Sequence, residues 1–170
     1  MPRVALTRRV RLAAAHRYWR PEWTPERNRA VFGPCANEPG HGHTYTVEVT
    51  VAGEVDEVTG FVVDLGWLDA VLREEVLEPL DHQHLNVAVP EFAPGRAVPT
   101  TENLVLYLWG RLARRLGERL VRLRVYEADD LYAELPAPSS SSSATASSPS
   151  AHAGKRRPKT RSTRPPSSAE

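Results

Sequence analysis

Residues 43–55 read HTYTVEVTVAGEV, and this stretch decides the fold class. Its apolar side chains fall at every second position, with polar residues between most of them, at Tyr45, Val47, Val49 and Val51. Such alternation is typical of a β-strand that has one face in a core and one face in water. The stretch therefore predicts a half-buried strand.

The segments around this strand predict further elements in a simple order. Residues 3–16 alternate in the same way, whereas leucine and valine recur at helical spacing after Asp64 and again after Thr100 or Thr101. An aspartate or a threonine suits the N-cap of a helix, so we expect two helices that begin at these positions. The two remaining strands are predicted at residues 119–128 and 131–135.

The order strand, strand, helix, helix, strand, strand is that of an α+β fold. We expect an antiparallel four-stranded sheet that carries both helices on one face. A sheet of this size leaves two edges unpaired, and unpaired edges invite contact with other chains. An oligomer that closes the sheet is therefore the expected assembly.

The chain divides into an acidic domain and a basic tail. From position 136 to 170 the residues are mainly Ser, Ala, Pro, Arg and Lys, which bury too little apolar surface to fold. We therefore predict one domain at residues 1–135 and a disordered tail at 136–170. The tail holds six of the 22 basic residues and one of the 21 acidic ones. It could attract nucleic acid or an anionic surface weakly, but we favour a solubilising appendage, because nothing in it could read a base edge.

Cysteine count and hydropathy indicate the cellular compartment in which the protein works. Cys35 is the only cysteine of the chain, which excludes an internal disulfide and suits a reducing compartment. No apolar run approaches the ~18 residues of a membrane span. The arginine-rich N-terminus has a superficial likeness to a transit peptide, but its strand-like alternation assigns it to the mature domain. We therefore expect a cytoplasmic protein without membrane contact.

Two histidines at the start of the strand predict a metal site. His41 and His43 are separated by one residue, so both rings point to one face, roughly 6.6–6.8 Å apart at Cα. Gly42 between them is expected to admit another backbone or a ligand. His16 ends the first predicted strand, which the following loop could bring back antiparallel to the second. Three histidines without a fourth protein ligand describe a catalytic zinc site, whereas the alternative is a polar turn beside a surface histidine.

Three more residues could carry proton transfer. Cys35 lies six residues before His41 in a loop bounded by glycine and proline, where zinc would lower the thiol pKa. Its alternative is a small buried side chain. Asp81 and His82 are adjacent after the first helix, and a carboxylate beside an imidazole can tune it as a proton donor. The alternative interpretation is that Asp81 is a surface acid and His82 a histidine at the helix C-terminus. Glu127, at the end of a strand, indicates no function by itself.

Together these motifs resemble one family over residues 3–135. The motifs are AAAHR (13–17), the run from 28 to 65 that contains PCANEPGHGHTYTVEV, LEPLDHQHLN (77–86), PTTENL (99–104) and RVYEADDLYAEL (124–135). They are similar to those of 6-pyruvoyltetrahydropterin synthase and its bacterial sibling, 6-carboxytetrahydropterin synthase. The resemblance implies the tunnelling fold, in which subunits join into a barrel, typically as trimers paired into hexamers, with active sites at subunit boundaries.

The resemblance also implies a role for each candidate residue. The zinc site, the proton-transfer set and the pterin pocket of the family each have a counterpart in this sequence. The matching residues are His16, His41 and His43 for zinc, Cys35, Asp81 and His82 for catalysis, and Glu127, Thr100 and Thr101 for substrate binding.

The family substrate is 7,8-dihydroneopterin triphosphate, and the implied activity is that of a zinc-dependent lyase. The pyruvoyl branch yields 6-pyruvoyltetrahydropterin and triphosphate, whereas the carboxy branch of the queuosine pathway also releases acetaldehyde. Five residues separate Cys35 from the HGH motif, which resembles the pyruvoyl branch. A pterin-binding module without chemistry and an interaction protein that works through the basic tail stay open as alternatives.

Charge and loop position single out Arg17, Arg27 and Arg29 as candidates for triphosphate binding.

Overall fold

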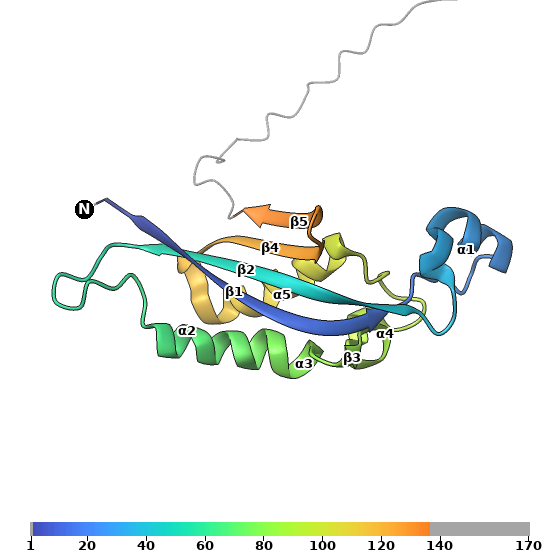
Figure 1. The fold of residues 1–170 in the computed structure, drawn as a ribbon, viewed down its shortest axis with the longest axis horizontal. Helices are drawn as coiled ribbons and strands as arrows, with labels where there is room; N and C mark the ends of the chain where they lie inside the picture. Colours follow the sequence, from blue (N-terminus) through green and yellow to red (C-terminus); the bar gives the residue numbers. More distant parts are fainter. Residues whose placement is uncertain (1, 137–170) are drawn as a thin grey trace, which may run out of the picture. The chain divides into compact units, whose positions relative to one another are not determined.

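The computed structural model describes residues 2–136, which form one mixed β-sheet with helices (Figure 1). The strand order is β3-β1-β2-β4-β5. The four predicted strands are present, each within two residues of its predicted ends, and the tail predicted at 136–170 lies outside the described residues except for its first residue. The strands are β1 (Val4–His16), β2 (His41–Gly53), β3 (Gln83–His84), β4 (Leu120–Ala128) and β5 (Leu131–Pro136).

One strand was not expected. β1 and β2 form a continuous antiparallel ladder in which His16 lies opposite His41, and β4 and β5 extend the sheet antiparallel from β2. On the other edge, β3 pairs parallel to β1 beside Ala14 and Ala15. The prediction of a purely antiparallel four-stranded sheet is therefore wrong: the sheet is mixed and five-stranded. The two residues of β3 are too few to show a strand periodicity in the sequence.

The core lies against one face of the sheet. Tyr45, Val47, Val49 and Val51 of β2 are fully buried, which confirms the inward face predicted from their alternation. Glu48 and Thr50 on the opposite face are also buried, because side chains of β1 hydrogen-bond to them, so the prediction that this face lies in water is wrong. Burying one apolar side chain of the inward face contributes roughly 1.5–3 kcal/mol. A slip of β2 by one residue would turn all four apolar side chains to the opposite face, so this hydrophobic pattern specifies the register.

The two long helical segments begin where the sequence predicts. The carboxylate of Asp64 accepts a hydrogen bond from the backbone N–H of Trp67 at 2.6 Å, and the Thr100 hydroxyl accepts one from the backbone N–H of Asn103 at 3.3 Å. A π-helical turn joins α2 to α3, and α5 packs on β4 and β5. Within the part of the chain that the structure describes, no helix is long and apolar enough to cross a membrane. The helices are α1 (Pro25–Phe32), α2 (Leu65–Leu72), α3 (Glu78–Leu80), α4 (Leu85–Ala88) and α5 (Thr101–Leu116).

The segment between β1 and β2, predicted as a loop, contains α1 and a 3₁₀ turn at Gly33–Ala36 (Figure 1). Asn28 organises this segment from a buried position. Its side-chain oxygen accepts from the backbone N–H of Arg20 at 2.8 Å, and its amide group donates to the Arg20 carbonyl at 2.9 Å. The 3₁₀ turn that follows α1 carries Cys35 back toward the end of β1.

Candidate functional site

Three histidines meet where β1 ends and β2 begins. His16 lies opposite His41 in the ladder, and His43 occupies the same face of β2 as the buried Tyr45. Nε2 of His16 is 3.2 Å from Nε2 of His41, and one ring nitrogen from each histidine lies within 4.8 Å of the other two. The structure therefore brings together the three residues that were predicted to bind zinc.

The close backbone approach beside this triad occurs at Gly40 and not at Gly42. A Cβ atom on Gly40 would lie 2.3 Å from the carbonyl oxygen of His16, and the φ angle of Gly40 is 111°. A Cβ atom on Gly42 would meet nothing nearer than 3.5 Å, which is an ordinary contact. The neighbouring strand therefore does not need glycine at position 42, and the approach of a ligand there stays a prediction. Gly40 lets the turn into β2 pass against the end of β1, which brings His41 beside His16.

Burial favours the neutral form of two of these histidines, His16 and His43. His16 is fully buried, and this burial is the main reason that its pKa falls from 6.5 to about 4. The negative charge of Glu127 acts in the opposite direction and raises the pKa, whereas the two neighbouring histidines lower it further. Burial is also the main cause of the lowered pKa of His43. A neutral imidazole has a lone pair to give, so the rings of His16 and His43 favour the protonation state that metal binding requires.

One ring nitrogen of the triad lacks a hydrogen bond. Nε2 of His43 is buried and has no hydrogen-bond partner among the described residues, although Oε1 of Glu127 lies 3.4 Å away. A buried polar atom without a partner is costly, and a metal ion shared by the three rings would satisfy it. The cluster therefore fits a metal ion, and imidazole donors suit zinc among other transition metals.

A cavity of about 350 Å³ adjoins the triad at Glu127. The Glu127 side chain is 10% exposed, and its Oε2 accepts hydrogen bonds from the hydroxyl groups of Thr101 and Tyr18. One carboxylate oxygen is thus held by hydroxyl groups while the other faces His43. The cavity is lined by Tyr18, Cys35, Thr100, Thr101, Glu102, Glu127 and residues 131–133 of β5.

Cys35 reaches this cavity from its 3₁₀ turn. Its carbonyl oxygen accepts a hydrogen bond from the backbone N–H of Tyr18 at 2.9 Å, which ties the turn to the end of β1. Burial, followed by the negative charge of Glu127, raises the pKa of the Cys35 thiol above its ordinary value of 9.0. A thiolate at neutral pH would therefore need a positive charge nearby, such as a metal ion in the triad.

Tyr18 lines the cavity and contacts both His16 and Glu127, but the sequence did not mark it as a site residue. Its ring centroid lies 4.6 Å from that of His16, and its hydroxyl donates to Oε2 of Glu127 at 3.4 Å. Burial raises the pKa of this phenol well above its ordinary range, which makes it a neutral hydrogen-bond donor. Its position two residues after His16 is the one feature of the sequence that could have pointed to it.

The chain matches the family model described as 6-pyruvoyl tetrahydropterin synthase over residues 5–138. The chain belongs to this family. It is 41% identical over 126 residues to 6-pyruvoyl tetrahydrobiopterin synthase of Homo sapiens, covering 74% of this chain and 86% of the human one. Dihydroneopterin monophosphate aldolase of Pyrococcus furiosus is 36% identical over 97 residues, covering 56% of this chain and 76% of the relative.

A solved structure of the family supports the fold. The 6-pyruvoyl tetrahydropterin synthase of Caenorhabditis elegans superposes with a TM-score of 0.75 at 30% sequence identity. The alignment covers 81% of this chain and 98% of the nematode protein. The α+β architecture with a mixed sheet is therefore that of the 6-pyruvoyl tetrahydropterin synthase family.

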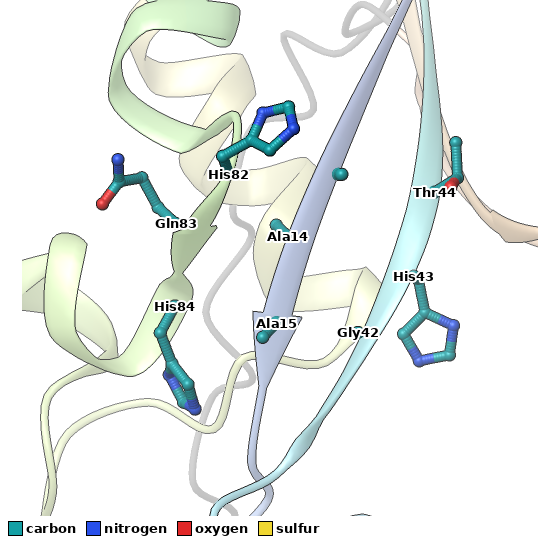
Figure 2. Close-up of a pocket in the computed structure, with 9 residues that line it drawn as sticks. Ala14, Ala15, Gly42, His43, Thr44, His82, Gln83 and His84 are labelled. Atoms are coloured by element: carbon teal, nitrogen blue, oxygen red, sulfur yellow. The ribbon is translucent and has the colours of Figure 1, made fainter.

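Asp81 and His82, which the resemblance groups with Cys35, lie elsewhere in the subunit. Asp81 accepts a hydrogen bond from the backbone N–H of Ala13 at 2.8 Å and contacts Nδ1 of His82 at 3.1 Å. The His82 side chain is 81% exposed and lines a second hollow of about 590 Å³, which His43 of the triad also borders. Figure 2 shows His82 beside β1 and His43 beyond it on β2, with the two rings pointing in different directions. Within one subunit, His82 does not line the cavity of Cys35.

The three arginines proposed for triphosphate binding also lie outside the cavity lining. Nε of Arg17 donates to the carbonyl oxygen of Ala36 at 2.9 Å, and its guanidinium group stacks on Trp19. The guanidinium group of Arg27 stacks on Trp23, 4.2 Å from the ring centroid. Arg29 is exposed in the last turn of α1. A contact between these residues and a bound triphosphate stays a prediction.

Proposed function

We propose that this chain is a zinc-dependent lyase that converts 7,8-dihydroneopterin triphosphate to 6-pyruvoyltetrahydropterin and releases triphosphate. One observation carries the proposal: Cys35 and Glu127 share a cavity, and Glu127 lies 3.4 Å from the histidine triad. A metal site, a thiol and a carboxylate are thereby available to one small substrate. The names of the family relatives, which include 6-pyruvoyl tetrahydrobiopterin synthase, support the same substrate class.

The pterin ring is expected to bind at Glu127. A carboxylate can accept two parallel hydrogen bonds, one from a ring N–H and one from the exocyclic amine. The hydroxyl groups of Thr101 and Tyr18 hold Oε2 of Glu127 and so orient the carboxylate for this contact. Thr100 lines the same cavity and caps α5, which keeps the adjoining backbone in place.

The substrate side chain then extends toward the triad. His16, His41 and His43 would hold the zinc ion, which would supply a Lewis acid for the side-chain hydroxyl groups. Cys35, as a thiolate, takes a proton from the side chain, and triphosphate leaves as the side chain rearranges by internal redox. Because burial and Glu127 raise the thiol pKa in the metal-free protein, this role of Cys35 depends on the positive charge of the bound metal.

Asp81 and His82 are proposed to act on the cavity of a neighbouring subunit. His82 stands beside β3 at one edge of the sheet, and the cavity is lined by β5 at the opposite edge. Leu131 and Tyr132 of β5 are 54% and 47% exposed. If copies join edge to edge into a trimer or hexamer, His82 of one copy approaches the cavity of the next. Asp81 then orients His82 for proton transfer across that boundary.

The proposal is tested by product analysis. Purified full-length protein is incubated with zinc and 7,8-dihydroneopterin triphosphate, and the products are identified by mass. Release of triphosphate with a 6-pyruvoyl product is expected. A 6-carboxy product with acetaldehyde would assign the chain to the carboxy reaction, and no release of triphosphate would overturn the lyase proposal.

Two variants separate the chemistry from the fold. Cys35→Ala should slow turnover while its zinc content stays equal to that of the wild type, and loss of zinc would instead make Cys35 a ligand. A chain shortened to residues 1–135 should keep full activity. Loss of activity in the shortened chain would favour a working role for the basic tail.

A further inference from the structure

Arg17 connects the end of β1 to the 3₁₀ turn that carries Cys35. Its side chain is 22% exposed, and its Nε donates a hydrogen bond to the carbonyl oxygen of Ala36 at 2.9 Å. Ala36 is the buried last residue of the turn at Gly33–Ala36. Arg17 itself directly follows His16, the last residue of β1. One residue therefore contacts the turn of Cys35 and adjoins the metal triad.

The turn depends on donors from the end of β1. The last carbonyl groups of a helical turn have no partner within it. The backbone N–H of Tyr18 donates to the carbonyl oxygen of Cys35 at 2.9 Å, and Arg17 satisfies the next carbonyl group. Nε of Arg17 is the only side-chain donor to this turn among residues 2–136. Without it, the buried carbonyl group of Ala36 would lose its partner, which would destabilise the turn in this position.

Asn86 fixes the backbone from which the Arg17 side chain extends. Oδ1 of Asn86 accepts a hydrogen bond from the backbone N–H of Arg17 at 2.8 Å, and Nδ2 donates to the carbonyl oxygen of Arg17 at 3.0 Å. On the other side of His16, Ala15 pairs with His84 of β3. The residues before and after His16 are thus held by one short segment. The backbone of Arg17, and through its side chain the turn of Cys35, is therefore fixed relative to His16.

The other contacts of the guanidinium group suit a structural link better than an anion site. The group stacks on Trp19, 4.2 Å from the ring centroid, and one of its terminal nitrogens lies 3.5 Å from a carboxylate oxygen of Glu38. A neighbouring carboxylate opposes the approach of an anion. Arg17 also does not line the cavity that holds Cys35 and Glu127.

We propose that Arg17 is a positioning residue that holds the turn of Cys35 in a fixed place beside the metal triad. The inference rests on the proposed role of Cys35 as the proton acceptor, and it replaces triphosphate binding as the role of Arg17. Arg17 acts through Ala36 and does not touch the substrate. Displacing a reacting group by about 1 Å can slow a reaction by roughly 100-fold. A loosened turn should therefore reduce kcat and leave KM nearly unchanged.

Two variants of similar side-chain length separate positioning from charge. Arg17→Gln loses the positive charge but keeps an N–H donor, because the amide nitrogen of glutamine is as many bonds from Cα as Nε of arginine. Arg17→Met loses both the charge and the donor. If Arg17 positions Cys35, kcat of Arg17→Met should be at least about tenfold below that of Arg17→Gln. The two variants should share one KM.

The test combines steady-state kinetics on 7,8-dihydroneopterin triphosphate with calorimetry on inorganic triphosphate, using the full-length chain. Equal kcat values for the two variants would overturn the inference. A loss of affinity for inorganic triphosphate in Arg17→Gln, at an unchanged kcat, would also overturn it and assign Arg17 to triphosphate binding. This second result stays decisive even if Arg17→Met fails to fold.

The reactivity of Cys35 gives a readout that does not depend on turnover. Cys35 is partly buried and is the only cysteine, so labelling by iodoacetamide reports on its turn alone. In the metal-free protein at one pH, Arg17→Met should be labelled roughly threefold to tenfold faster than Arg17→Gln, the factor that corresponds to one net hydrogen bond. Equal labelling rates would contradict the inference.

Arg73→Met is the control for the labelling experiment. It removes an ion pair of 3.4 Å with Glu78 in the helical layer and should be labelled at the wild-type rate. A wild-type chain that releases no triphosphate would overturn the proposed function. The labelling rates would still decide whether Arg17 holds the turn of Cys35.

Discussion

Nε2 of His43 lies 3.4 Å from Oε1 of Glu127, so the histidine triad and the cavity carboxylate meet at one point. The other oxygen of Glu127 is held by the hydroxyl groups of Thr101 and Tyr18. A ligand that binds Glu127 is therefore next to any metal ion in the triad. This relationship links the pterin anchor to the metal, and Cys35 on the wall of the same cavity completes the set that one subunit supplies.

The protonation of Cys35 should depend on both Glu127 and zinc. Because burial and the charge of Glu127 raise the thiol pKa, alkylation of Cys35 in the metal-free protein should reach its half-maximal rate above pH 9. Glu127→Gln removes the negative charge and should move that midpoint downward, whereas Glu118→Gln at an exposed site should not. The rate is measured with iodoacetamide and mass spectrometry, since Cys35 is the only cysteine.

Zinc should shift the same midpoint further toward neutral pH, because a nearby dication stabilises a thiolate. An unchanged midpoint in the zinc-loaded protein would leave Cys35 a thiol at neutral pH. The role of Cys35 as a proton acceptor would then be wrong, although its place on the cavity wall would stand.

The metal-free protein should lose stability as the pH falls from 6.5 toward 4. The pKa of His16 is lowered to about 4 by burial, so over this window the unfolded chain binds a proton that the folded chain does not. The stabilising contribution is present above pH 6.5 and is lost as the pH falls, and it amounts to about 3 kcal/mol at most. Urea unfolding in the presence of a chelator measures the change.

His16→Gln is the control for this pH dependence. The variant lacks the titrating ring, so its unfolding free energy should fall less between pH 6.5 and 4 than that of the wild type, whatever its absolute stability. Equal slopes in the two proteins would show that His16 is not the group responsible. His43, whose pKa is lowered in the same direction, would be the next residue to examine.

Gly40 and Gly42 should respond very differently to alanine. A Cβ on Gly40 would lie 2.3 Å from the His16 carbonyl oxygen at a φ of 111°, so Gly40→Ala must move the end of β1 and disturb the triad. We expect a loss of roughly 1–3 kcal/mol in unfolding free energy and weaker zinc binding. Gly42→Ala, with 3.5 Å of room, should change zinc affinity little. If Gly42→Ala weakened zinc binding more than Gly40→Ala, the close approach at Gly40 would not be what positions the triad.

The local parts of this molecule could be predicted from the sequence. Alternation along β2 gave its buried face, and the caps at Asp64 and Thr100 gave the helix starts, because each depends on residues near one another in the chain. The pairing of His16 with His41 was also foreseen, since a strand that returns antiparallel brings its first residue to the last residue of its partner. The family resemblance supplied Glu127, which no local pattern marked.

The parts that were missed depend on contacts between distant segments. β3 exists because the backbone after α3 reaches the free edge of β1. The need for glycine at position 40 arises from the carbonyl group of His16, 24 positions earlier. The separation of His82 from Cys35 arises because His82 lies just before β3 and Cys35 lies in the 3₁₀ turn beside the other cavity, which the order of motifs along the chain does not reveal.

That separation leads to the sharpest prediction for the assembly. Cys35→Ala and His82→Ala should each turn over substrate much more slowly than the wild type. If His82 serves the cavity of a neighbouring copy, a mixed oligomer contains some cavities in which an intact Cys35 meets an intact His82. In oligomers that carry both variants, random mixing of equal amounts should restore about a quarter of the wild-type activity for a hexamer and about a third for a trimer. The two variants are co-expressed with different tags, and the oligomers that carry both tags are purified and assayed.

The double variant Cys35→Ala/His82→Ala, co-expressed with itself, is the matched control and should show no recovery. Mixed oligomers that form but show no recovery would mean that Cys35 and His82 act within one subunit, against the 81% exposure of His82 and its absence from the lining of the Cys35 cavity. A chain that is monomeric by mass in solution, yet fully active, would contradict the shared site more directly. Recovery of activity would instead show that the active site forms where two subunits join at their sheet edges. One subunit would supply Cys35 and its neighbour would supply His82.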